Sequence, residues 1–204
     1  MELGSYVAIA LAVFVGATVQ SVVGLGVGLV AAPVMALLEP WTMPGSLLML
    51  ALVLPVATLT HDHDDIDWAG LAWSLPARVF GTGVGVAVVA VFTHQQLGVA
   101  VGLVVLFMVL ITWQAVEVPI NHATLSGAGF VSGITGTATS IGGPPFALLY
   151  QHRPAQQIRT TMAVYFVVGA ALSLVGLLAV GDLTWDQARA AVELIERAGG
   201  VVAG

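Results

Sequence analysis

The chain has 204 residues, of which 58% are hydrophobic and only 8% are charged, and its mean hydropathy is +1.01. A soluble domain carries about 25% charged residues, so these few charges cannot cover a core with a solvated surface. The formal net charge of −6 excludes binding to nucleic acid through a basic surface. Because there is no cysteine, disulfides, thiolate catalysis and thiolate metal sites are excluded as well. Composition therefore predicts an all-α integral membrane protein.

Apolar stretches in chain order predict about six membrane spans, since a spanning helix needs roughly 20 mostly apolar residues. We expect these spans in residues 6–38, 46–60, 68–92, 96–113, 125–150 and 162–180. The first is interrupted at residues 24–28 and at Pro33, and the fifth at Gly136 and again at residues 141–145. No cleaved targeting peptide is expected, because residues 1–5 carry no basic charge before the first apolar stretch.

Polar segments separate these spans. Residues 61–67 form an acidic loop, residues 117–123 a polar connection, and residues 151–159 a second polar loop. The histidines and aspartates of residues 61–65 are consecutive and have no second cluster to complete a metal shell, so we expect a solvated loop there. The tail from Thr184 onward is too polar for a bilayer core, and its oppositely charged residues share a helix face, which indicates an amphipathic interfacial helix.

The two halves of the chain resemble each other, which predicts an internal repeat. Residues 15–40 and 131–154 both carry an apolar helix, a glycine-rich break and prolines, and each is followed by another apolar helix. We expect a first transmembrane repeat in residues 1–115 and a second in residues 116–204. The second is shortened, because it has no counterpart of residues 73–113. If each interrupted stretch crosses the membrane once, the repeats are parallel; if each is a re-entrant hairpin, they are inverted and loops 61–67 and 151–159 share a face.

Paired breaks in corresponding positions are the best pointer in a sequence to a transporter's binding site. Irregular backbone at membrane depth must be buried in protein or line a wet cavity, and a helix that starts after a break directs free N–H groups and a positive dipole end at an anion. The alternative for any single glycine is close helix packing. The candidate substrate-binding residues are Gln20, Ser21, Gly24, Gly26, Gly28, Pro33, Thr139, Ser140, Gly142, Gly143, Pro144 and Arg159.

Two arginines are candidates for charge chemistry. Arg159 is close to the second break, and its planar guanidinium suits an oxyanion, although an interfacial anchor is an equal alternative. Arg78 lies well inside a predicted span, where a charge is costly and is a functional hypothesis by default. For Arg78 we favour a side chain that extends to the acidic loop at the start of its helix.

The sequence resembles the TauE/SafE sulfite exporter family of membrane permeases. The resemblance is carried by Gly133–Gly136 with residues 140–145, by the weaker first copy in residues 24–33, and by the turns at residues 67–68 and 181–185. It implies a multi-pass protein of the plasma (inner) membrane that moves sulfite, thiosulfate or organosulfonates, with no cofactor. The expected partners are the small anionic substrate, the lipid bilayer and further copies of the chain in a homo-oligomer; no nucleic acid is expected.

Two other classes of function remain as alternatives. A non-transporting structural membrane subunit fits the short second half, but a scaffold has no need of exposed backbone at the bilayer centre. An intramembrane serine protease needs a nucleophile with an oriented base, and His122 and His152 flank the span that holds the candidate serines. The His-Glu-x-x-His pattern of a metalloprotease is absent from the sequence. We therefore expect a secondary transporter and not an enzyme.

Overall fold

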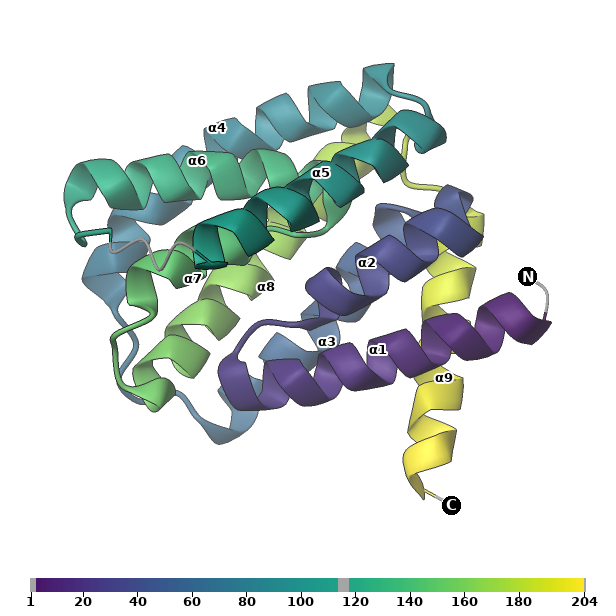
Figure 1. Ribbon diagram of the computed structural model, residues 1–204, viewed down its shortest axis with the longest axis horizontal. Coiled ribbons are helices and arrows are strands. Elements are labelled where there is room, and N and C mark those ends of the chain that lie inside the picture. Colours follow the sequence, from purple (N-terminus) through teal and green to yellow (C-terminus); the bar gives the residue numbers. More distant parts are fainter. Residues whose placement is uncertain (1–2, 114–117, 204) are drawn as a thin grey trace.

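The computed structural model describes residues 3–113 and 118–203, which form helices and loops without a strand. The helices are α1 Leu3–Val23, α2 Val27–Leu38, η1 Pro40–Thr42, α3 Gly45–His61, α4 Trp68–Val91, α5 His94–Trp113, α6 His122–Thr139, α7 Pro144–Tyr150, α8 Ala155–Val180 and α9 Trp185–Ala203 (Figure 1). By length and composition, three helices in the described part are able to cross a membrane, within α1, α4 and α8. The all-helical class is confirmed; six spans and an internal repeat stay predictions, and the expected boundary at residues 115–116 lies outside the described residues.

Each interrupted stretch folds back on itself as a helical hairpin. Helix α1 is followed by Gly24, which has a φ of 90°, and α6 ends at Ser140, which has a φ of 61°. The left-handed region turns the chain sharply and is a common way to end a helix. In the first hairpin, a methyl group on Gly16 would lie 2.9 Å from the Cα of Val27, so α2 packs closely along α1.

Two expectations about the breaks and one about the second polar loop need correction. Helix α6 continues through Gly136 to Thr139, because this glycine serves as a contact surface: a methyl group on it would lie 3.1 Å from the Cα of Gly142. Helix α2 continues through Pro33. A proline removes one backbone hydrogen bond, but membrane helices accept this where neighbouring helices satisfy the freed carbonyl group. The second polar loop is shorter than expected, because α8 begins directly after Pro154.

The two hairpins enter the bundle from opposite ends and meet at their tips. In Figure 1, α1 starts at the right, beside the N-terminus, and α6 starts at the left. Where α3 ends and α8 begins, the guanidinium of Arg159 donates to the Asp62 carboxylate, and the Tyr150 hydroxyl donates to Asp67 at 2.8 Å. The loops at residues 61–67 and 151–154 therefore lie at the same end, as the re-entrant alternative requires.

Helices α4 and α6 pack with their backbones almost in contact. Methyl groups on Gly81 and Gly129 would overlap the backbone of Phe130 and Ser74, and one on Gly133 would lie 2.5 Å from the Arg78 carbonyl oxygen. Small residues at such spacings let membrane helices approach closely, where van der Waals packing stabilises the pair. The packing alternative for glycine is thus correct along this contact, and it fixes α6, which carries the second break, against α4.

Buried apolar side chains lock the second break into the first hairpin. Ile141 is 1% exposed and packs in one cluster with Ile9 of α1, Met35 of α2 and Leu47 of α3. A second cluster surrounds Phe146 of α7 and joins it to α4, α6 and α8. The break residues are therefore held from both sides by close-packed side chains.

The tail forms a helix, as expected, and its less polar face packs on α3. Gln187 of α9 is buried and donates to the carbonyl oxygens of Trp41 and Met43, both at 3.1 Å, while the Ser46 hydroxyl donates to the Gln187 carbonyl at 2.7 Å. Leu194 belongs to the same cluster as Ile9. The position of α9 at the membrane interface stays a prediction.

Two glycines of α4 that lie two residues apart provide a test of the α4–α6 contact. We expect Gly81→Ala to lower the free energy of unfolding by about 1–3 kcal/mol, the usual cost of overpacking, because its methyl group would overlap the Phe130 backbone. Gly83→Ala should instead stabilise by about 0.5–1 kcal/mol, since alanine is the better helix former and nothing lies within 4 Å of its methyl group. Thermal unfolding in detergent measures both; equal shifts would contradict the packing described.

Candidate functional site

The tips of the two hairpins border a small, partly open cavity of about 30 Å³. Seven predicted site residues line it, namely Gln20, Gly26, Gly28, Ser140, Gly142, Gly143 and Pro144. Leu25, Leu29, Ala51, Ile141 and Phe166 complete the wall. A cavity needs about 10–15 Å³ of such space to hold a water molecule, so this one is large enough to be hydrated.

The two breaks touch through backbone atoms. A methyl group on Gly28 would lie 2.5 Å from the carbonyl oxygen of Ser140, and one on Gly143 would lie 2.7 Å from the Phe166 ring. A side chain at Gly28 would force the hairpins apart, and one at Gly143 would displace Phe166 of α8. Glycine is required at residue 28 because two segments of backbone approach each other closely there.

The first break presents N–H groups of the kind that bind anions. The Gln20 side-chain oxygen accepts from the Val27 N–H at 3.1 Å, and the Gly26 carbonyl accepts from Val30. In the described part of the chain, nothing accepts from the N–H groups of Gly28 and Leu29. These two donors and the positive end of the α2 dipole border the cavity.

The second break differs from what the sequence led us to expect. Helix α7 opens with Pro144 and Pro145, which have no N–H, and the next two N–H groups both donate to the Gly143 carbonyl oxygen. The Ile141 N–H donates to the Thr139 hydroxyl at 3.3 Å. The remaining donors are the loop N–H groups of Gly142 and Gly143, for which the described residues supply no acceptor. The second half of the site is thus made by loop backbone and not by a helix end.

Five other predicted residues lie outside the cavity wall. Ser21 is exposed and donates to the Ala17 carbonyl of its own helix at 2.9 Å. The Thr139 hydroxyl donates to the Thr135 carbonyl at 2.7 Å, and Pro33 lies within α2. Gly24 packs on the backbone of Arg159, since a methyl group there would lie 3.1 Å from the Arg159 Cα.

The charge of Arg159 already has a partner. Its guanidinium forms an ion pair with Asp62, and the two side chains are 31% and 38% exposed. The pair joins the start of α8 to the acidic loop and leaves Arg159 outside the cavity. The role of Arg159 in substrate binding stays a prediction.

Arg78 does not extend to the acidic loop, contrary to our expectation. It is only 2% exposed, and its guanidinium lies between α4, α6 and α8. Methyl groups on Gly136 and Gly142 would each lie 3.2 Å from Nη2, and Cζ lies 4.2 Å from the ring centroid of Tyr165. Three glycines that are distant from Arg78 in the sequence, Gly136, Gly142 and Gly169, provide the space for this side chain. Arg78 therefore lies directly against the second break.

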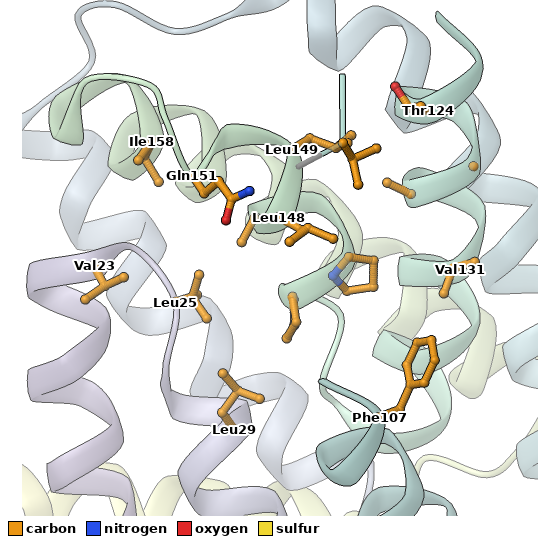
Figure 2. Close-up of a pocket in the computed structure, with 16 residues that line it drawn as sticks. Val23, Leu25, Leu29, Phe107, Thr124, Val131, Leu148, Leu149, Gln151 and Ile158 are labelled. Carbon is orange, nitrogen blue, oxygen red and sulfur yellow. The ribbon is translucent and has the colours of Figure 1, made fainter. Parts of the chain in front are cut away.

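A larger groove of about 600 Å³ runs beside the small cavity and is almost entirely apolar. Figure 2 shows Leu25 and Leu29 of the first hairpin facing Leu148 and Val131 of the second. Leu25, Leu29 and Pro144 line both spaces, so they form the partition between them. An apolar lining suits hydrocarbon and not an anion, and the polar groups of the breaks remain the candidate site.

Long apolar helices and paired breaks with unpaired backbone donors are typical of helical membrane transporters. Residues 8–204 match the sulfite exporter TauE/SafE family, and the chain belongs to that family. The resemblance seen in the sequence is thereby confirmed over essentially the whole chain. No curated protein and no solved structure matches the chain.

The cap formed by Gln20 yields a stability prediction. Gln20→Leu leaves the buried Val27 N–H without an acceptor, so we expect the free energy of unfolding to fall by about 1–3 kcal/mol. Ser21→Ala is the matched control on the adjacent residue, because Ser21 is exposed and bonds only within its helix. Thermal unfolding in detergent should show a clear loss for the first variant and little change for the second. Equal melting temperatures for Gln20→Leu and the wild type would contradict the cap.

Proposed function

We propose that this protein is a secondary transporter that moves small sulfur-containing anions, sulfite, thiosulfate or organosulfonates, across the plasma membrane. The observation that carries the proposal is the meeting of the two breaks. Gly28 lies against Ser140, and the backbone of both breaks borders one cavity. Membership of a family of membrane transporters supports the same conclusion.

The donors at the breaks fit a small oxyanion. Gly28 and Leu29 on one side and Gly142 and Gly143 on the other offer N–H groups at a site with little water, where hydrogen bonds to an ion are strong. Several oxygen atoms on one sulfur atom accept from several directions, as donors on both hairpins require. Multi-pass insertion and assembly with further copies of the chain belong to the same proposal.

The small volume of the cavity supports alternating access. The cavity of about 30 Å³ lies between tips whose backbones already touch at Gly28 and Ser140, so we expect the two hairpin tips to separate when an anion enters. Because the hairpins enter from opposite ends, moving one away from the other opens the site toward one end at a time (Figure 1). The conformation described here is then a closed one between the two open states.

Transport by purified protein in proteoliposomes tests this proposal. We expect saturable uptake of labelled sulfite, thiosulfate or a sulfonate, with sulfate as the comparison. Gly28→Val and Gly142→Val should lower uptake about tenfold or more, because overpacking costs about 1–3 kcal/mol at a contact that must form in each cycle.

Gly102→Val is the matched control, since Gly102 of α5 is exposed and has nothing within 4 Å of an added methyl group. Its uptake should equal that of the wild type. Absence of uptake for all four anions, in protein that is folded and inserted, would overturn the transport proposal and favour a structural subunit.

A further inference from the structure

Arg78 is a buried charge near the middle of α4, a helix that is long and apolar enough to cross a membrane. It follows the start of α4 by ten residues, which is about 15 Å of helix and so half of the ~30 Å hydrocarbon core. Its side chain is 2% exposed, so the guanidinium does not reach either surface. Such a charge is costly to hold in a membrane and is retained only for a purpose.

The protein itself leaves this charge without a counter-charge. Within the described residues no carboxylate lies at ion-pair distance from Arg78, and Nε and Nη1 are buried with no hydrogen-bond partner. The Tyr165 ring beneath Cζ offers a cation–π contact, which compensates a buried guanidinium only in part. Because most buried polar atoms in proteins are paired, two orphaned donors on one charged group indicate a missing ligand.

Two neutral hydroxyl groups beside Arg78 are orphaned in the same way. The hydroxyl groups of Thr82, about one turn further along α4, and of Tyr165 in α8 are buried without a partner in the described structure. The Tyr165 ring lies against the guanidinium, and Thr82 lies about one turn from Arg78 on the same face of α4. An oxyanion accepts from guanidinium and hydroxyl groups alike.

The location connects Arg78 with the hairpin tips. Nη2 faces Gly142, whose backbone also lines the small cavity, so the second break separates the guanidinium from the cavity by one residue of chain. Each of the two guanidinium edges that include Nη2 also carries one orphaned donor, Nε or Nη1. A small shift of the second break would expose a whole edge to an anion held between the tips.

We propose that Arg78 is the fixed counter-charge of the transported anion, binding its oxygen atoms through the guanidinium while Tyr165 and Thr82 donate their hydroxyl groups. This inference rests on the proposed function and adds to it a charged ligand for a small oxyanion. It also assigns the three glycines around the guanidinium a purpose, which is to leave room for Arg78 directly behind the break.

Anion-induced stabilisation of the purified full chain in detergent tests Arg78 independently of transport. Sulfite, thiosulfate, a sulfonate, sulfate and chloride are titrated while the melting temperature is followed. We expect the wild type to be stabilised by at least one oxyanion, and Arg78→Met to weaken that binding about 30-fold or more, as removal of one partner of a buried charge pair does. Arg78→Lys keeps the charge but loses the planar edge, so it should bind the oxyanion more weakly than the wild type and lose the preference over chloride.

The controls separate binding from folding. Without anion, Arg78→Met should melt at or above the wild-type temperature, because it removes an unpaired buried charge. Arg189→Met is the matched control: Arg189 lies exposed on α9 over the ring of Trp185 and should retain wild-type affinity. If Arg78→Met does not fold, Arg78→Lys carries the test alone.

Each outcome decides one of the two proposals. Wild-type affinity in Arg78→Met, or in Arg78→Lys where that variant stands alone, overturns the role of Arg78; uptake by the wild type would then still support transport. Loss of binding in these variants without any wild-type uptake supports the anion site and overturns transport. A wild type that none of the five anions stabilises overturns the role of Arg78, and wild-type uptake alone then decides the transport proposal.

Discussion

Non-helical backbone inside an apolar environment must be covered by protein, and this constraint organises the whole fold. Within residues 3–113 and 118–203 there are two such segments, after α1 and after α6, and each covers the other. Gly28 approaches the Ser140 carbonyl so closely that no side chain fits, and Ile141 is buried among residues of α1, α2 and α3. The N–H groups that remain unpaired lie between the hairpins, at the small cavity.

The close packing of α4 on α6 serves the same constraint. Glycines on both helices bring their backbones together, so α6 is held up to the residue where it ends. The Ser132 hydroxyl then donates to the Gly142 carbonyl and ties the loop back to its helix. Arg78 emerges from this tight contact, which explains how a long charged side chain is kept at a defined place behind the second break.

The sequence predicts local features of the chain well, but it does not predict which way a side chain points. Clusters of glycine and proline mark the breaks because they act on the chain within a few residues, and seven residues named from them line one cavity. The direction of Arg78 was wrong because it depends on Gly136, Gly142 and Gly169, which lie on other segments and leave no periodic signal near residue 78. Gly136 and Pro33 were misread as breaks, since neither residue type alone ends a helix that its neighbours support. The lack of backbone N–H groups at Pro144 and Pro145, by contrast, follows from the sequence alone, because proline has no such donor.

Because of Pro144 and Pro145, the two halves of the candidate site are not equivalent. A carrier with equivalent halves would treat its two sides alike, whereas here the donors on one side belong to a helix end and those on the other to a loop. The donors of a helix end share one direction along the helix axis, whereas those of Gly142 and Gly143 take their directions from the loop and from the side chains packed around it. In the proposed transport cycle, the two hairpins therefore hold the ion in different ways.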